Sequence, residues 1–477
     1  MSVPAMMVSL DIQVVATALP VIRLHLHASL AALEWTVNAY TLSFAVLLLT
    51  ASALGERLGR RRMLIVGIAL FTVASAACAL APDVGALIVA RAVQGAGAAL
   101  MLPLSMALLS AAFPPERRTW ALGIFTGVTG IAVFAGPVLG GAIAQGMSWQ
   151  WIFWLNMPIG VVLIPLILTR IPGRGGESGA ARLDATGLVL GTGGAFGLVW
   201  ALIRAGGAGW GSPEIVTTLT AGLLLAAGFV AWERRTAQPM MPVQLFASRQ
   251  FAAGNAAGFA LFATMNGLVF FMAQFLQTGL GYSPLDAGLR LLPGWVPPVL
   301  IAPFAGALVA RIGVRPLVSG GMAITAAGLT WIALIGRTGL PYWQLIIPLV
   351  LTGSGVSLAM PAAAGAVMRA APAPMIGKAS GTYNTLRQLG GVFGLAICAA
   401  VFSARGSYGS PATFVTGFGP AIGTCAGLAG ISAVAGLFLT ARRQPATPRN
   451  QPATPQTEPA TSQNQTASPQ TEPAHVS

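Results

Sequence analysis

The stretch GERLGRRRMLIVGIALFTVASAACAL, residues 55–80, joins a cluster of arginines directly to an unbroken apolar block. A block of about 20 residues is long enough for a helix to cross the roughly 30 Å apolar core of a bilayer. It also lacks the continuous polar face that a surface helix of a soluble protein carries. The stretch therefore predicts a membrane-spanning helix with positive charge at its first end.

Similar blocks follow one another along the whole chain. The chain is 55% hydrophobic and 8% charged, whereas soluble domains carry about 25% charged residues. This composition argues against a large soluble helical protein and predicts an all-α integral membrane protein. The fourteen predicted spans are 3–22, 35–55, 62–81, 86–109, 119–145, 150–169, 184–204, 213–232, 251–279, 286–310, 315–335, 342–368, 378–403 and 415–440.

The net charge of +14 would suggest nucleic acid as the partner of a soluble protein. Here the basic residues lie mainly in alternate short gaps between apolar blocks, where they set membrane topology. We therefore expect no nucleic-acid partner, and a cytoplasmic (inner) membrane protein with both termini in the cytoplasm. The predicted cytoplasmic gaps hold Arg57, Arg60, Arg61, Arg62, Arg117, Arg118, Arg170, Arg174, Arg182, Arg234, Arg235, Arg249, Arg311, Arg315, Arg369, Lys378, Arg442 and Arg443, and the opposite gaps hold only Arg23, Arg204, Arg337 and Arg405.

The two ends of the chain differ from the blocks between them. Only ten residues precede Asp11 and none is basic, so we expect the native start to lie upstream of Met1. From 442 to 477 the chain repeats QPATP and PQTEPA, which predicts a disordered tail. We expect this tail to be dispensable, with a docking role as the alternative. Cys78, Cys398 and Cys425 lie in apolar blocks without short spacing, so neither a disulfide framework nor a metal site is expected.

The gap after the second span, SALGERLGRRRML, resembles the signature loop of the major facilitator superfamily, G-x-L-a-D-R-x-G-R-R/K. Ser52 replaces the usual first glycine, and Glu56 replaces the usual aspartate. The acid of this motif can pair with arginines or with a helix N-terminus, and its glycines permit a tight turn. The predicted conformational motif is Gly55, Glu56, Arg57, Gly59, Arg60 and Arg61.

The next two spans carry further motifs of this superfamily. Arg91, Gln94 and Gly95 resemble its R-x-x-Q-G motif, and the arginine and glutamine share a helix face because they are three residues apart. The fifth span resembles the glycine series that marks antiporters in the superfamily, and ordinary small-residue packing is the alternative. The predicted antiporter motif is Gly127, Gly130, Gly136, Pro137, Gly140 and Gly141.

Several runs resemble the fourteen-helix drug:proton antiporters of the superfamily. These runs are 149–160, 281–293 and 377–397, together with the opening L-D-x-x-V-V-x-x-A-L-P pattern. The resemblance implies two six-helix bundles with two inserted helices. The implied boundaries are 1–170 for the first bundle, 171–239 for loops and the inserted pair, and 240–441 for the second bundle. The tail at 442–477 lies outside the resemblance.

Asp11 lies inside the apolar opening block, where a carboxylate costs roughly 2.5–3.5 kcal/mol on insertion scales. An acid that pairs with Arg91 in one state and loosens in another can bind and release a proton, which a proton-coupled carrier requires. We therefore predict Asp11 and Arg91 as the proton-coupling pair. A static structural ion pair is the alternative, in which case Glu34 and Glu56 become the next candidates.

The chain is predicted to export drugs or other lipophilic or cationic small molecules in exchange for protons, as a monomer in membrane lipid. The alternatives are an exporter of one endogenous metabolite or antibiotic, a membrane enzyme and a non-transporting receptor. An enzyme is disfavoured because no nucleophile–base pair, metal cluster or nucleotide loop is present, so no catalytic residue, cofactor or metal is expected. The predicted pocket residues are Gln94, Asn266, Gln274, Asn384, Arg387 and Gln388.

Overall fold

The computed structural model describes residues 1–113, 115–171, 184–236, 239–372 and 375–440. The predicted tail and the loop at 172–183 lie outside the described residues. Within them, the chain is built from helices and contains no strand, which confirms the all-α fold. The elements are α1 Ser2–Leu26, α2 Leu30–Leu58, α3 Arg60–Ala79, α4 Val84–Ala112, α5 Pro115–Gly146, α6 Trp151–Trp154, α7 Asn156–Arg170, α8 Ala185–Ala208, α9 Pro213–Arg235, the 3-10 turn η1 Val243–Ala247, α10 Arg249–Gln274, the π turn η2 Phe275–Gly279, α11 Pro284–Arg290, α12 Leu292–Ile312, α13 Val314–Ile335, α14 Trp343–Ala370, α15 Ile376–Ser403 and α16 Pro411–Leu437.

The long helices have the length and composition of membrane spans. Among the described residues, 13 helical stretches are long and apolar enough to cross a bilayer. The 21-residue helix α12 occupies the position of the remaining predicted span. The prediction of a multi-pass helical membrane protein is therefore confirmed.

Two of the predicted spans are interrupted for a common reason. The sixth span divides into α6 and α7 at Leu155, and the tenth divides into α11 and α12 at Leu291. In each case a proline follows three or two residues later, at Pro158 and Pro293. Since proline has no backbone N–H to donate to the carbonyl four residues earlier, the hydrogen-bond ladder is interrupted there, while Leu155 and Leu291 keep helical backbone angles.

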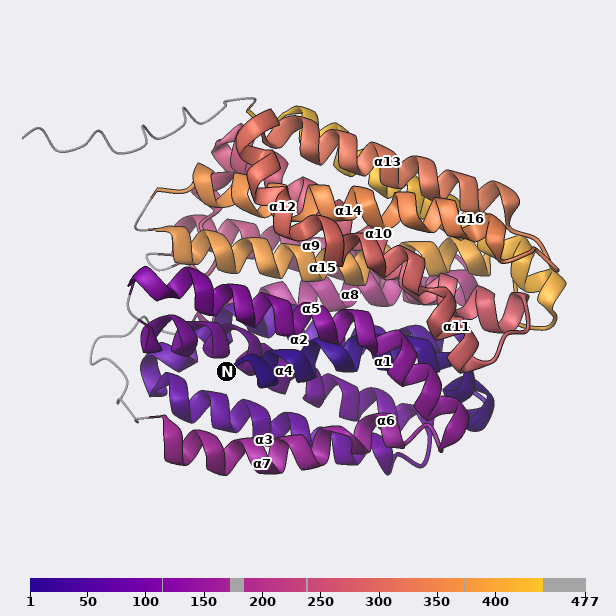
Figure 1. Cartoon of the computed structure of the whole chain (residues 1–477), viewed down its shortest axis with the longest axis horizontal. Coiled ribbons are helices and arrows are strands. Elements are labelled where there is room, and N and C mark those ends of the chain that lie inside the picture. Colours follow the sequence, from indigo (N-terminus) through magenta and orange to yellow (C-terminus); the bar gives the residue numbers. More distant parts are fainter. Residues whose placement is uncertain (114, 172–183, 237–238, 373–374, 441–477) are drawn as a thin grey trace, which may run out of the picture.

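The helices form two groups with an inserted pair between them (Figure 1). In the first group α2 and α3 pack along α4, and α1 packs along α5. In the second group α13 packs against α14 and α16, and α10 packs against α15. The inserted helices α8 and α9 pair with each other, and α8 also contacts α2 and α15, one helix from each group. The exact bundle boundaries at 170 and 240 stay a prediction.

The two ends of this helix stack differ in charge. One end, here called the arginine-rich end, carries the turns at Gly59 and Gly313. Both glycines have positive φ, 98° and 90°, and each joins two helices in its own group. A residue with a Cβ would be strained in this conformation. The other end, here called the opposite end, carries residues 27–29, 147–150, 280–283 and 404–410.

Candidate functional site

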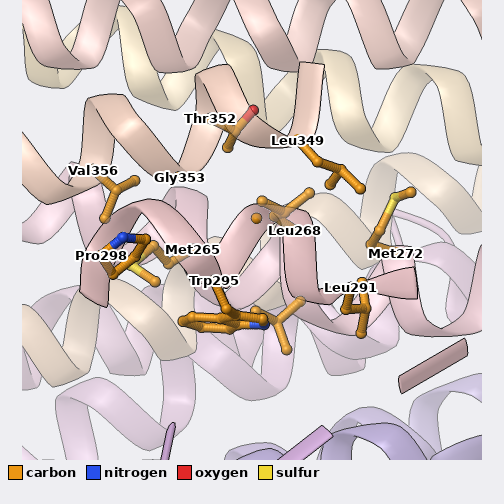
Figure 2. A pocket seen from close by; sticks show the side chains of 12 residues that line it. Met265, Leu268, Met272, Leu291, Trp295, Pro298, Leu349, Thr352, Gly353 and Val356 are labelled. Carbon is orange, nitrogen blue, oxygen red and sulfur yellow. The ribbon is translucent and has the colours of Figure 1, made fainter. Parts of the chain in front are cut away.

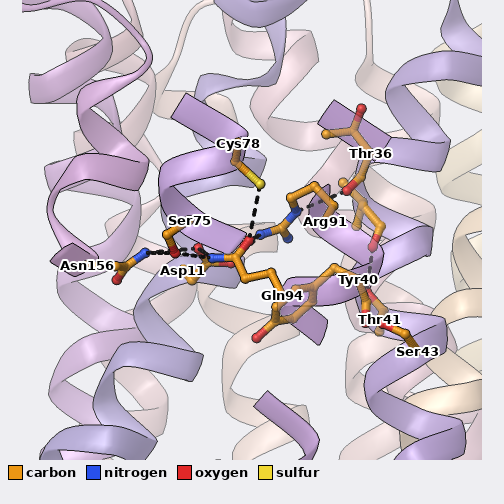
Figure 3. A network of polar contacts seen from close by, with 11 residues as sticks. Asp11, Thr36, Tyr40, Thr41, Ser43, Ser75, Cys78, Arg91, Gln94 and Asn156 are labelled. Atoms are coloured by element: carbon orange, nitrogen blue, oxygen red, sulfur yellow. Dashed lines mark hydrogen bonds and ion pairs between the residues drawn. The ribbon is translucent and has the colours of Figure 1, made fainter. Parts of the chain in front are cut away.

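Asp11 lies at the centre of a buried polar network in the first helix group (Figure 3). It is only 3% exposed, although its helix α1 is apolar on all sides. Its carboxylate Oδ2 lies 2.5 Å from Nη1 of Arg91 on α4. Arg91 is 1% exposed, so this is an ion pair removed from solvent. The two charges singled out in the sequence are therefore in direct contact.

Gln94 connects the ion pair to α3. Its amide nitrogen donates to Asp11 Oδ1 and to the hydroxyl of Ser75, both at 2.8 Å. Its carbonyl oxygen accepts from Arg91 Nη1 at 2.7 Å. One turn of α4 thus presents both residues to Asp11, because positions three apart share a helix face.

Two further helices complete the network. Asn156, the first residue of α7, donates to Asp11 Oδ1 at 3.3 Å. Arg91 Nε donates to the backbone carbonyl of Thr36 on α2 at 3.2 Å, and the guanidinium lies 4.2 Å from the centre of the Tyr40 ring. The guanidinium is therefore held by a carboxylate, two further oxygen acceptors and an aromatic face, which together offset its cost of burial.

The polar network around the Asp11 carboxylate joins five helices, α1, α2, α3, α4 and α7. Asp11 accepts hydrogen bonds from three side chains, Arg91, Gln94 and Asn156. A proton on Asp11 would compete with these donors, so protonation would loosen the contacts between α1, α4 and α7. The geometry can therefore link proton binding to helix movement, and it can equally serve as a static ion pair.

The signature loop forms the turn between α2 and α3 at the arginine-rich end. A Cβ on Gly55 would meet the side chain of Leu104 on α4, so this glycine allows close helix packing. Arg61 donates to the carbonyl of Leu168 near the end of α7 at 2.6 Å, while Arg57 and Arg60 are exposed. The side chain of Glu56 lies outside the described ones, so its expected pairing stays a prediction.

The glycines of the predicted antiporter motif divide into two sets. A Cβ on Gly136 would meet the Gln13 side chain, and one on Gly140 would lie 2.7 Å from the carbonyl oxygen of Val14, so both allow α5 to approach α1. Among the residues that the structure describes, nothing lies within 4 Å of such a Cβ on Gly127 or Gly130. Only the later part of the motif therefore serves close packing in this conformation.

The same motif also joins the two helix groups at the opposite end. A Cβ on Gly141 would meet the backbone of Pro284 on α11, and one on Gly288 of α11 would meet the carbonyl of Pro137 on α5. Gln277 donates to the carbonyl of Thr17 at 2.9 Å, which links η2 to α1. The two groups are thus in tight backbone contact toward the opposite end.

The predicted polar pocket residues have separate surroundings. Gln94 belongs to the Asp11 network. Asn266 and Asn384 donate to carbonyls one turn earlier on their own helices, and Gln274 accepts a hydrogen bond from the hydroxyl of Tyr408. Arg387 lies with its guanidinium 4.4 Å from the centre of the Phe262 ring, and Gln388 is buried.

An apolar pocket lies between α10, α12 and α14 of the second group (Figure 2). Its volume is about 50 Å³, which is room for a few water molecules and too little for a drug-sized compound. None of the six predicted polar residues lines it, so their role in a pocket stays a prediction. The lining residues are Met265, Leu268, Val269, Met272, Leu291, Gly294, Trp295, Pro298, Leu349, Thr352, Gly353 and Val356.

Sequence reasoning did not single out Ser75, Asn156 or the Tyr40 ring. A serine or an asparagine in an apolar block can form its hydrogen bonds with many neighbouring helices, so the sequence alone does not show which residues it contacts. Asn156 lies within the run WQWIFWLNMPIG, whose resemblance to drug antiporters was the available clue. The pocket was missed because it consists of ordinary apolar side chains from three distant segments.

Comparison with known proteins identifies the family of this chain. The family model of the Major Facilitator Superfamily matches residues 2–395 and 254–471. The chain belongs to the major facilitator superfamily. This membership makes it a transporter rather than an enzyme.

Relatives within the major facilitator superfamily include exporters of antibiotics. The chain is 36% identical to the tetracenomycin C resistance and export protein of Streptomyces glaucescens, over 85% of this chain and 75% of the relative. It is also 36% identical to a cephamycin export protein of Amycolatopsis lactamdurans, over 87% and 86% of the two chains. A multidrug resistance protein of Mycobacterium tuberculosis is 35% identical over 83% and 74%.

Solved structures support the fold. A POT family transporter in complex with 5-aminolevulinic acid superposes with a TM-score of 0.67, covering 91% of this chain and 94% of that chain at 14% sequence identity. At this identity the similarity shows the fold alone.

Proposed function

We propose that this transporter exports drugs or other lipophilic or cationic small molecules across the cytoplasmic membrane in exchange for protons. The observation that carries the proposal is the buried Asp11–Arg91 pair with its hydrogen-bonded partners Gln94 and Asn156. Charged groups inside a membrane protein are costly and commonly mark ion pathways. The export roles of the antibiotic-resistance relatives support the same direction of transport.

Asp11 is the proposed proton carrier. When it is ionised it holds Arg91 and the donors from α4 and α7. When it is protonated the carboxyl no longer balances the guanidinium, so the contacts between α1 and α4 are weakened. Substrate binding and proton binding then act on the same conformational equilibrium, which is the requirement for exchange.

The orientation follows from the arginines. The arginine-rich end is proposed to face the cytoplasm, because positive residues are retained on that side during insertion. The opposite end then faces outward, and the tight contacts of Gly141 and Gly288 there correspond to a conformation closed to the outside. In this conformation the substrate would bind from the cytoplasmic side, and the proton would be released to that side.

The proposed substrate region is apolar. Met265, Met272 and Trp295 line the cavity in the second helix group. Methionine and tryptophan side chains adapt to varied apolar and aromatic ligands. Since the cavity is small in this conformation, binding of a drug-sized compound would require α10, α12 and α14 to separate.

The test is substrate-induced proton movement in everted vesicles or proteoliposomes, measured across a panel of lipophilic and cationic compounds. Exchange predicts that each exported compound releases protons from an acid-loaded lumen, and that collapse of the proton gradient abolishes its accumulation. Accumulation that continues unchanged without a gradient would contradict proton coupling.

A second candidate is an exporter of one endogenous antibiotic that protects its producer. The names of relatives that confer resistance to tetracenomycin C and methylenomycin A favour this alternative. The compound panel separates the two: proton release with many unrelated compounds supports a multidrug exporter, and release with a single compound supports a dedicated one.

A further inference from the structure

A second buried carboxyl group, Glu34, lies in the first turns of α2, at the opposite end. It is 1% exposed, yet it belongs to no ion pair among the described residues, and its Oε2 is buried without a hydrogen-bond partner. Asp11, by contrast, is held by a cation and two amide donors. A buried carboxylate without such partners is strongly disfavoured, whereas a neutral carboxyl group is tolerated.

The surroundings of Glu34 come from both helix groups. The helix α2 packs against α15 of the second group, and Trp35, next to Glu34, lies in one apolar cluster with residues of α15. The Cys398 thiol on α15 and the Tyr408 hydroxyl in the loop that follows α15 lie within electrostatic range of Glu34. The same loop is tied to the first group, since the guanidinium of Arg23 on α1 lies 4.1 Å from the centre of the Tyr408 ring. Glu34 is therefore enclosed by the contact between the groups.

The cations on the helices around α2 are engaged elsewhere. Arg91 on α4 pairs with Asp11, and Arg204 on α8 pairs with Glu214. Arg387 on α15 lies against the Phe262 ring, and the arginines of α3 lie at the arginine-rich end. On α3, the Cys78 thiol is directed to Gln94. The titratable residues His25, His27, Asp83 and Arg405 are also at this end, and all four are exposed to solvent.

The face of α2 that carries Glu34 also carries a second buried polar side chain, that of Asn38. Asn38 is one turn after Glu34 and so shares its helix face. It is 1% exposed, and neither its amide oxygen nor its amide nitrogen has a hydrogen-bond partner in the part of the chain that the structure describes. Buried polar groups in folded proteins are nearly always hydrogen-bonded. A face that carries unpartnered groups when the helix groups touch is expected to bind water once they separate.

We infer that Glu34 is a second proton-binding site, at the contact between the two helix groups, and that closure of the opposite end requires a proton on it. The closed form holds Glu34 neutral, so acid favours closure. As the pH rises, Glu34 ionises, the closed form is penalised and the opposite end opens to hydrate the carboxylate. This site differs from Asp11, whose carboxylate is surrounded by a guanidinium and two amide donors.

The test measures the opening of the opposite end directly. Nitroxide labels are placed on cysteines introduced at Leu24 and Ala404, both exposed at the opposite end and located in different groups, in the full chain with its three native cysteines replaced by alanine. The distance between the two labels is measured by electron paramagnetic resonance spectroscopy as the pH is raised. In this parent chain, the fraction of molecules with a short distance between the labels, here called the short-distance population, should fall as the pH rises.

The variants decide the assignment. Glu34→Gln should keep the short-distance population at every pH, and Glu34→Asp should retain a pH-dependent loss of it. Glu34→Ala is a second neutral variant in case the amide does not fold. Glu214→Gln is the matched control, because this acid is at the same end but partly exposed and paired with Arg204, and it should behave like the parent.

Two outcomes would overturn the inference: a parent chain whose distances ignore pH, or a neutral Glu34 variant that opens as the parent does. The inference rests on the proposed exporter function only in that the opposite end must open during the cycle. Since the distances are measured without substrate, its failure is distinguishable from a failure of proton-for-drug exchange.

Discussion

The guanidinium of Arg91 and the carboxylate of Asp11 meet at 2.5 Å, although 80 residues separate them in the chain. Each charge alone would be unfavourable in an apolar helix bundle, and the pair is stable because each supplies the other's counter-charge. The amides of Gln94 and Asn156 satisfy the remaining carboxylate oxygen. The most direct tests of the proposed mechanism therefore begin at Asp11.

Asp11→Asn keeps the shape of the side chain and removes its titration. We expect substrate-induced proton release and drug resistance to be lost together. Arg91 would lose its counter-charge, at a cost of about 3–5 kcal/mol, reduced here because Thr36 and Gln94 still supply oxygen acceptors. Asp11→Glu should retain part of both activities with an altered pH dependence.

The measurement compares proton release and resistance for the three forms at matched membrane levels. Wild-type exchange by Asp11→Asn would assign Asp11 a structural role and direct attention to Glu34 and Glu56.

Gly141→Ala should impair transport, because the new Cβ would overlap the backbone of Pro284 and oppose closure of the opposite end. Gly130→Ala is the matched control on the same helix, since a Cβ there meets nothing within 4 Å. The control should keep wild-type transport, with stability unchanged or raised by roughly 0.5–1 kcal/mol. Efflux rates of a fluorescent substrate would measure the difference. Equal rates for the two variants would refute the role of the Gly141 contact.

Trp295→Ala should weaken export of large aromatic compounds while leaving insertion intact. The indole lines the apolar pocket of the second group, and loss of a well-buried apolar side chain costs about 1.5–3 kcal/mol. Because Trp295 is only partly buried, we expect about a tenfold loss of apparent affinity. Trp343→Ala, at a tryptophan that is 68% exposed, is the control. Dose–response curves across several compounds would show whether the two variants differ.

The proposed orientation predicts opposite labelling of the two ends. A cysteine at Ser407 should react with a membrane-impermeant maleimide added outside intact cells, and a cysteine at Glu177 should react only after permeabilisation. Ser407 is exposed at the opposite end, and Glu177 lies in the arginine-containing stretch between α7 and α8. The reverse pattern would invert the assignment of the cytoplasmic face.

The residues that could be found from the sequence are those whose side chains are energetically costly to place inside an apolar block. Arg91 and Asp11 are conspicuous because a charge within an apolar block must be compensated, and the arginine-containing gaps are conspicuous because they alternate along the chain. The glycine series was visible as well. The sequence did not distinguish Gly136, Gly140 and Gly141, which face a neighbouring backbone, from Gly127 and Gly130, which face open space.

The sequence by itself determined that this protein spans the membrane many times and carries a charge pair in its first group of helices. Both conclusions follow from the cost of transferring each residue into hydrocarbon, which depends on local composition. Only the tertiary structure decided that Asn156 reaches Asp11 and that Ser75 joins the same network through Gln94. It alone placed the apolar pocket between α10, α12 and α14, and it alone showed that Glu34 Oε2 is buried without a hydrogen-bond partner among the described residues. These features depend on which faces of distant helices meet, and neutral or small side chains can meet in many ways at nearly equal local cost.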